Sequence, residues 1–278
     1  MSSTSNPSSN VTSSTTPRAV SNATSKPTVA VSGSPGAVDS SPSCSASFAA
    51  NEPGSAAALR PYLEPGAAVD SGHPAVIEFA RRAAGEATEP RAIAIALYYA
   101  VRDEIRYDPY RIDLAPAGLT ASRCLENGYG FCVTKAVLLA AALRVHGIAA
   151  RLGFADVRNH MTSARLRATM GTDVFAYHGY TDILLDRRWV KATPAFNLSL
   201  CRKAGTQPLE FDGVTDSILH PFDLAGRRHM EYVRDRGTSA DLPRDDMVRV
   251  WDELYPATVE WKRGGAHGDF EHDVERPA

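Results

Sequence analysis

Two side chains in this sequence have the chemistry of a nucleophile and its base, Cys132 and His178. Cys132 lies in "GYGFCVTKAVLLAAALRVHGIAAR", between a glycine-rich turn and a long run of small and branched apolar residues. In the first turn of a helix, unpaired backbone N–H groups and the helix dipole favour the thiolate, which is the nucleophilic form. The same N–H groups can receive the negative oxygen of a tetrahedral intermediate. The pattern therefore favours an acyl-transfer nucleophile at Cys132.

His178 stands in the middle of a predicted strand, in "FAYHGYTD", and is the candidate general base. Each residue alone has a structural interpretation, because a buried helical cysteine usually behaves as a small hydrophobe and a strand histidine usually packs or faces solvent. The two together, in this order and on these elements, are much more specific. They predict a Cys–His pair in which His178 moves the proton.

The loop before Cys132 offers candidate substrate-binding residues. Asn127 could supply an oxyanion-hole amide, and the Gly130 turn, after Gly128, could let a substrate approach the backbone closely. Tyr129 and Phe131 flank Gly130 and could wall a substrate channel, although packing beneath the loop is the default interpretation for both.

Helices must hold this loop in place. Apolar residues at helical spacing predict helices over 73–87 and 89–109, the second beginning at Pro90 and stopped by Pro109. A short helical turn is expected within 119–130, and the longest helix over Cys132–His146, closed by Gly147. That last helix is apolar nearly all round, so we expect it to be central and buried.

Strand patterns follow this helix, over 148–157, 173–186 and 187–196, the last two joined by a tight turn at Asp186-Arg187. Helices followed by an antiparallel sheet predict an α+β domain. Beyond Asn197, segments 226–237 and 244–256 resemble surface helices.

Composition divides the chain into three parts. Residues 1–59 are rich in Ser, Thr and Pro with only four charged residues, so they are predicted to be a disordered tail. Residues 60–262 should form the folded domain, with its core motifs over 90–200, and residues 263–278 a charged C-terminal tail.

The two motifs resemble the transglutaminase-like superfamily. "GFCVTKAVLLAAALRVHGIAARLGF" is similar to its nucleophile helix and following strand, and "YHGYTDILLDRRWVKATPAFN" to its histidine strand, turn and Trp-containing strand. The resemblance implies a papain-like fold, with a central nucleophile helix packed on an antiparallel sheet. It also implies that Cys132 is the nucleophile and His178 the general base.

The third member of the triad departs from the family pattern, because Thr193 stands where the family usually has an aspartate. A two-residue turn would pair Tyr180 with Thr193 and His178 with Ala195, placing Thr193 diagonally from His178 on the same face. Its hydroxyl could accept the imidazole N–H. Asn197, just beyond the strand, could instead fold back as an amide orienter.

Two aspartates are weaker candidates for the same role. Asp182 shares the face of His178, but four residues along a strand is about 13 Å, which is too far for a hydrogen bond. Asp156, at the end of the preceding strand, would need a favourable order of strands. An amide or hydroxyl in place of the carboxylate need not abolish activity, since the tautomer can still be set.

Charge and composition exclude several other classes. With 30 basic and 32 acidic residues the chain is nearly neutral, so nucleic acid is not expected as a partner. No run of about 18 apolar residues and no basic, apolar leader is present, so we expect a cytoplasmic protein without a membrane span. Four cysteines without a C-x-x-C pair, and no H-x-x-x-H spacing, predict no metal, and no cofactor is expected.

The sequence thus predicts a cysteine-dependent enzyme that attacks an amide or carboxamide, on a protein, a peptide or a small amide. Hydrolysis of a peptidase or amidase type is slightly favoured over transamidation of proteins. The alternative is a non-catalytic binding or scaffolding module that keeps the fold. The oligomeric state is left open.

Overall fold

The computed structural model describes residues 56–160, 164–218, 226, 229–255 and 270–274. They all belong to one compact unit, Ala46–Ala278, so the predicted disordered tail lies almost wholly outside the described residues. The strands are β1 (Arg106–Tyr107), β2 (Tyr129–Gly130), β3 (Ala150–Asn159), β4 (Val174–Leu185), β5 (Arg188–Ala192) and β6 (Met230–Ser239). The helices are α1 (Ala56–Leu59), η1 (Arg60–Tyr62), α2 (Pro74–Ala84), α3 (Pro90–Glu104), η2 (Pro116–Leu119), α4 (Ala121–Asn127), α5 (Cys132–Val145), α6 (Ala164–Met170), α7 (Leu198–Ala204), α8 (Arg244–Leu254) and α9 (Phe270–Asp273).

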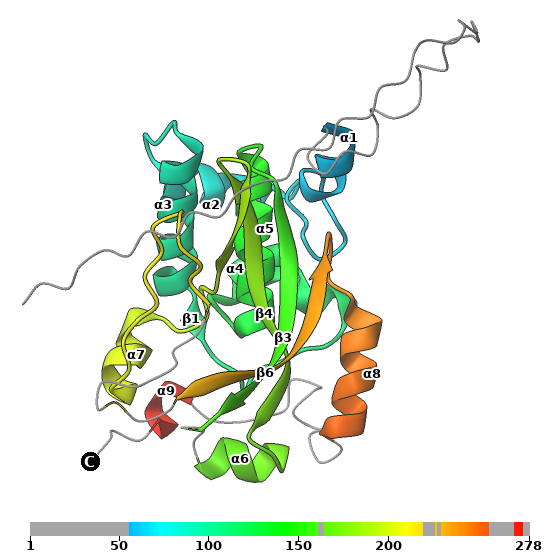
Figure 1. The fold of residues 1–278 in the computed structure, drawn as a ribbon, viewed down its shortest axis with the longest axis vertical. Coiled ribbons are helices and arrows are strands. Elements are labelled where there is room, and N and C mark those ends of the chain that lie inside the picture. Colours follow the sequence, from blue (N-terminus) through cyan, green and yellow to red (C-terminus); the bar gives the residue numbers. More distant parts are fainter. Residues whose placement is uncertain (1–55, 161–163, 219–225, 227–228, 256–269, 275–278) are drawn as a thin grey trace, which may run out of the picture. The chain divides into compact units, whose positions relative to one another are not determined.

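The main sheet is antiparallel, with strand order β5-β4-β3-β6, and α5 packs along β4 and β3 (Figure 1). Helices α2, α3 and α4 also contact α5, so the helix lies between them and the sheet. A second, two-stranded parallel sheet joins β1 to β2 directly before α5. This is the α+β architecture predicted from the sequence, with the helix that begins at Cys132 at its centre.

Helix α5 is buried along nearly its whole length, as its apolar composition predicts, and this includes its two basic residues. The Lys135 ammonium donates to the carbonyl oxygens of Arg102 (2.9 Å) and Ile105, at the C-terminal end of α3. The Arg144 guanidinium donates to the carbonyl oxygens of Ala150 and Glu64. Each charge is thus held by backbone acceptors, which is a requirement for burying it.

The predicted hairpin between β4 and β5 is confirmed. Asp186 (φ 47°) and Arg187 (φ 63°) both have positive φ, as a type I′ turn requires, and the ladder runs in the expected register to the pair Thr181–Ala192. There β5 leaves β4, because Ala192 bridges to Ser217 and the Thr193 N–H donates to the Ser217 carbonyl (2.8 Å). The ladder therefore stops short of the predicted pairs of Thr193 and Ala195.

The predicted helix over 226–237 is wrong, because residues 230–239 form β6 and pair with β3. Most of the β6 side chains are partly or fully exposed, as expected of a strand at the sheet edge. The charged residues of this segment are compatible with either a surface helix or an edge strand. The segment forms a strand because β3 has an edge with which it can pair. The other predicted segment is helical as α8, although it buries Met247 and Trp251.

The described part of the predicted C-terminal tail contains α9. Its Phe270 is buried, with ring centroids 5.6 Å from Tyr107 and 5.4 Å from Tyr110. This short helix therefore packs near β1 instead of standing free.

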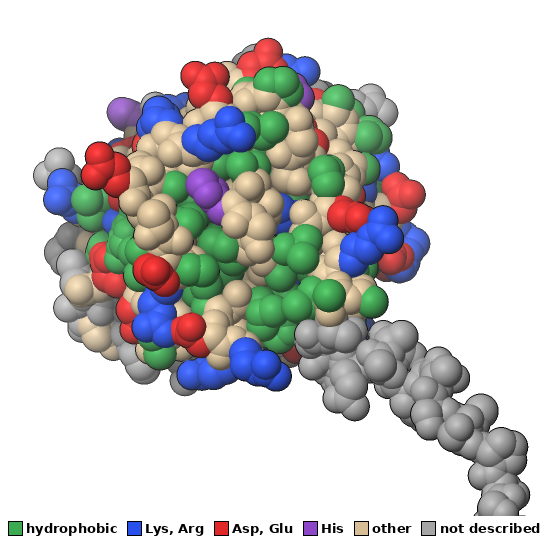
Figure 2. Space-filling view, turned by 90° about the horizontal axis from the view of Figure 1, so that it is seen from above, with side chains coloured by type: hydrophobic (Ala, Val, Ile, Leu, Met, Phe, Trp, Pro, Cys, Tyr) green, Lys and Arg blue, Asp and Glu red, His purple; other side chains and the backbone are tan. Residues whose placement is uncertain are grey.

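Within the described residues, no helix combines the length and apolarity needed to cross a membrane. On the face drawn in Figure 2, acidic and basic side chains are interspersed with apolar ones and form no broad patch of a single sign. That distribution agrees with the nearly neutral composition.

Candidate active site

Cys132 is the first residue of α5, where the sequence predicted it. The Thr134 hydroxyl accepts the N–H of Phe131 (3.0 Å), which precedes the helix with extended backbone, and so fixes where α5 begins. Only 8% of Cys132 is exposed. Cys132 therefore sits at a helix N-terminus that is itself embedded in the core.

Gly130 serves packing. A Cβ at this position would lie 2.6 Å from the Thr134 hydroxyl and 2.9 Å from the Cys124 sulfur, so only glycine lets β2 run this close to α5. The positive φ predicted for a sharp turn belongs to Gly128 (φ 64°), which ends α4.

Gly130→Ala is expected to lower the free energy of unfolding by about 1–3 kcal/mol, because the added methyl group forces Thr134 or Cys124 to move. Urea denaturation checks this. Gly85→Ala is an exposed comparison whose Cβ would meet nothing within 4 Å, so its effect would come from its positive φ alone. Equal stability of Gly130→Ala and the parent protein would contradict the packing role.

Strand β4 meets the start of α5 at Gly179, the residue after His178. A Cβ on Gly179 would lie 3.0 Å from the Val133 Cα and 3.4 Å from the Cys132 carbonyl oxygen, so the two backbones are in close contact. The backbone amides of Gly179 and Val133 act on the Cys132 thiol and lower its pKa. The predicted meeting of the cysteine helix with the histidine strand is thus made by backbone at Gly179.

Burial has the larger effect on the thiol. It raises the pKa of Cys132 to about 11, and the nearby amides only partly offset this. Two buried phenols, Tyr107 and Tyr255, also lie within electrostatic range of Cys132. Burial therefore raises the pKa of Cys132 more than the helix N-terminus lowers it, and the thiol is neutral near pH 7.

His178 is buried as well, and burial lowers its pKa to about 4. No charged group among the described residues contributes to that shift. The imidazole is therefore neutral at pH 7, which is the form that can accept a proton.

The predicted orienting residues make other hydrogen bonds. Asn197 Oδ1 accepts the N–H of Tyr107 (3.0 Å), and its Nδ2 donates to Ser199 Oγ (2.7 Å). The Thr193 hydroxyl donates to the carbonyl oxygen of Ile218 (3.3 Å). Both side chains are buried, and these bonds join loop and strand backbones instead of the His178 ring.

Asp182 and Asp156, the two aspartates considered for orienting the His178 imidazole, lie on different strands. Asp182 pairs with Arg151, 2.8 Å away and directly opposite it on β3. Asp156 lies on β3, next to β4, and its Oδ1 accepts the N–H of Tyr177 (3.1 Å), one residue before His178.

The residues predicted to bind substrate in the loop before Cys132 differ in burial. Asn127 is exposed at the end of α4, and the half-buried Tyr129 ring is covered by the Arg111 guanidinium, 5.2 Å from its centroid. Phe131 is buried, with its ring centroid 6.0 Å from that of Trp251. Packing beneath the loop, the default interpretation of Phe131, is therefore what the structure shows.

Sequence reasoning missed Tyr107 and Tyr255, which lie near the thiol, and Trp251, which packs against Phe131 beside it. The spacing of Met247, Trp251 and Tyr255, four residues apart, is an apolar helix face that could have predicted their burial. Nothing in the sequence indicated that this face would lie against the site.

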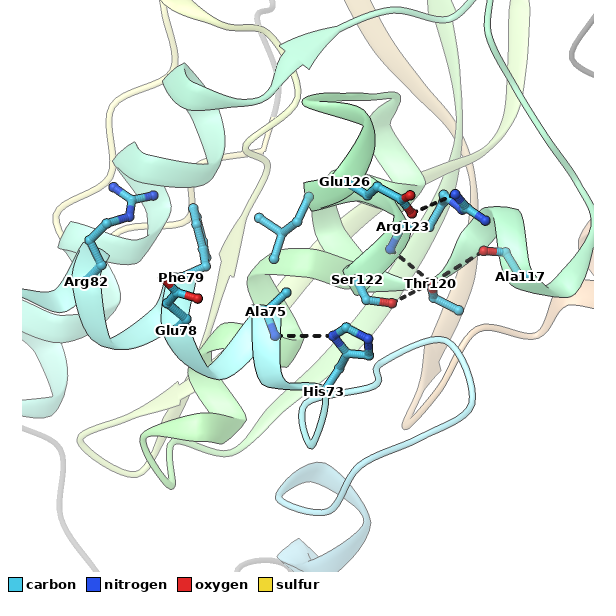
Figure 3. A pocket seen from close by; sticks show the side chains of 11 residues that line it. His73, Ala75, Glu78, Phe79, Arg82, Ala117, Thr120, Ser122, Arg123 and Glu126 are labelled. Carbon is cyan, nitrogen blue, oxygen red and sulfur yellow. Dashed lines mark hydrogen bonds and ion pairs between the residues drawn. The ribbon is translucent and has the colours of Figure 1, made fainter.

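A groove of about 760 Å³ lies away from these residues, lined by α2, η2 and α4 (Figure 3). Its polar atoms are largely engaged in helix capping and local ion pairs: Thr120 caps α4, His73 caps α2, and Arg123 pairs with Glu126 at 2.6 Å. Cys132 and His178 do not line it. Among the residues described, no cluster of three or more His, Cys, Asp or Glu could hold a metal ion.

Residues 77–194 match the sequence profile of the transglutaminase-like superfamily. The matched stretch includes Cys132, His178 and the whole of the first motif, and it ends at Pro194, within the second motif. This part of the chain is therefore similar to the transglutaminase-like superfamily.

Two solved structures are similar. A "Putative Cysteine Protease" from Cytophaga hutchinsonii is 14% identical with a TM-score of 0.44, over 68% of this chain and 49% of that one. A "putative protease" from Parabacteroides distasonis is 15% identical with a TM-score of 0.31, over 48% and 26%. The chain thus spans about half the length of the first and a quarter of the second. No curated protein matches it.

Proposed function

We propose that this protein is a cysteine-dependent acyl-transfer enzyme that hydrolyses a peptide or amide bond, with Cys132 as nucleophile and His178 as general base. The observation that carries the proposal is the contact of the Gly179 backbone amide with the Cys132 thiol at the start of α5. This contact joins the two motifs of the transglutaminase-like core.

The neutral state of both groups supports a general-base mechanism instead of a preformed ion pair. His178 takes the thiol proton as the Cys132 sulfur bonds to the substrate carbonyl carbon, and the carbonyl oxygen becomes negative. Backbone N–H groups at the start of α5 are suited to stabilise that oxygen. The imidazolium then protonates the leaving amine as the C–N bond breaks, and water, deprotonated by His178, releases the acid from the thioester.

The proposed substrate class follows from the chemistry of the nucleophile. A protein or peptide, or a small amide, fits a nucleophile that attacks carbonyl carbon. An amine in place of water would give transamidation through the same thioester.

A non-catalytic module is the second candidate function. The raised pKa of Cys132 and the absence of a charged partner for His178 among the described residues favour it.

Acylation by p-nitrophenyl acetate tests the proposal without knowledge of the natural substrate. We expect one acetyl group per chain, mapped by mass spectrometry to Cys132, with release of p-nitrophenolate. Cys132→Ala should abolish the modification. Cys201→Ala, which removes another buried thiol, should keep it. A parent protein that gains no acetyl group at Cys132 would identify the binding module instead.

A further inference from the structure

Strand β4 contains an irregularity directly before His178. The ladder with β3 shifts register between Ala155 and Val157, so that Ala176 and Tyr177 together lie opposite Asp156. Tyr177 has φ 59°, a left-handed conformation that bulky residues rarely adopt. A bulge of this kind inverts the alternation of side chains, so it decides to which side the next residue, His178, projects.

Side chains from two other elements hold one half of the bulge. Asp156 Oδ1 accepts the Tyr177 N–H (3.1 Å), which the bulge takes out of the ladder. Arg236, on β6, donates to both carboxylate oxygens of Asp156, with Nη2–Oδ2 at 2.8 Å. Its guanidinium also covers the Tyr177 ring, 4.5 Å from the centroid.

Helix α8 and the residue after it hold the other half. Trp251 Nε1 donates to the Ala176 carbonyl (2.9 Å), and the Tyr255 hydroxyl accepts the Ala176 N–H (2.7 Å). The same hydroxyl donates to the Val174 carbonyl (2.9 Å). Backbone groups that a regular strand would pair with a neighbour are thus bonded to buried side chains.

We propose that Asp156, supported by Arg236, Trp251 and Tyr255, is a positioning residue that locks this bulge and thereby aims the His178 imidazole. The inference rests on the proposed function, because aiming matters only if His178 acts on Cys132. It gives Asp156 a role beside the histidine that differs from the direct hydrogen bond considered for the triad. Asp156 acts on the backbone one residue earlier.

The chain provides a matched control on the same two strands. Asp182 on β4 and Arg151 on β3 also form a largely buried ion pair at 2.8 Å, but they lie in regular ladder, directly opposite each other. Asp156→Ala and Asp182→Ala therefore remove the same chemical group from similar surroundings. Only the first removes a support of the bulge.

The experiment compares these two variants with Asp156→Asn, which keeps an oxygen acceptor for the Tyr177 N–H. The acetylation rate of Cys132 with p-nitrophenyl acetate should fall about 10- to 100-fold in Asp156→Ala, since a small misplacement of a catalytic group has effects of this size. Asp156→Asn should recover most of the rate. The acetylation rate in Asp182→Ala should stay within about twofold of the parent rate. Urea denaturation of each variant gives its folded fraction, by which the rates are corrected.

The His178 imidazole, followed by NMR, gives a readout that needs no activity. In Asp156→Ala its ring resonances should shift and its pKa should rise from about 4 toward the ordinary value, because a misdirected ring loses its burial. Asp182→Ala should leave both unchanged. An unchanged His178 titration in Asp156→Ala would overturn the positioning role, whereas an altered titration with no acetylation of the parent protein would overturn the proposed enzyme alone.

Discussion

Replacing His178 with alanine is expected to slow the acetylation of Cys132 by p-nitrophenyl acetate by about 100- to 10,000-fold near pH 7. The reason is the state of the thiol. Because burial holds the pKa of Cys132 at about 11, very little thiolate exists at that pH, and the reaction depends on a base that removes the proton during attack. Without the imidazole, only the small thiolate fraction reacts.

The pH dependence separates this mechanism from a preformed ion pair. The parent rate should be lost as the pH falls through about 4, where His178 becomes protonated and can no longer accept a proton, and should be nearly flat from there to neutral pH. The His178→Ala rate should instead rise about tenfold per pH unit toward the pKa of the thiol. Acetylation of Cys132 measured by mass spectrometry over this range gives both profiles.

Two outcomes would contradict this account. Parallel profiles in the parent protein and His178→Ala would show that the imidazole takes no part in the proton transfer. His146→Ala is the matched control, because His146 lies at the opposite end of α5, where its Nε2 contacts the Ala80 carbonyl oxygen (3.1 Å). A similar loss in that variant would point to a general effect on the fold.

The stability contributed by Lys135 is expected to increase with pH. Burial lowers the pKa of this ammonium to about 7, whereas in the unfolded chain it keeps its ordinary value near 10.5. Between these values the unfolded chain binds the extra proton, so stability rises with pH by about 1.4 kcal/mol per unit. The contribution is largest above the unfolded pKa and is lost as the pH falls toward 7.

The comparison of the parent protein with Lys135→Met isolates this effect. Methionine keeps an unbranched side chain but has no proton to lose and no donor for the carbonyl oxygens of Arg102 and Ile105. The difference in unfolding free energy between the two proteins should shift by about 2 kcal/mol in favour of the parent between about pH 7 and pH 9. Urea denaturation at each pH measures it.

Lys191→Met serves as the control, since Lys191 lies partly exposed on β5. A change with pH that Lys191→Met shares with Lys135→Met would have a cause other than burial of the Lys135 ammonium. A difference for Lys135→Met that does not change with pH would show that the buried ammonium keeps its ordinary pKa, and that the two carbonyl acceptors compensate fully for its burial.

Most of the local elements follow from the sequence alone, which also marks Cys132 and His178 as candidates for chemistry. The spacing of apolar residues predicted α5 and its end at Gly147, and the Asp186-Arg187 turn set the register of β4 and β5, because these features depend on neighbours in the chain. The motifs around Cys132 and His178 predicted the similarity to the transglutaminase-like superfamily that the comparison shows over residues 77–194. Such signals are carried by contiguous residues.

The surroundings of these residues depend on contacts between distant segments. Segment 230–239 became an edge strand because β3 offered an unpaired edge, and Asn197 was drawn to the Tyr107 N–H instead of the imidazole. The bulge at Tyr177 exists through partners on β3, β6 and α8, and the neutral state of Cys132 comes from burial by distant segments. These are free energies of desolvation and of contacts between residues far apart in sequence, which no local pattern records.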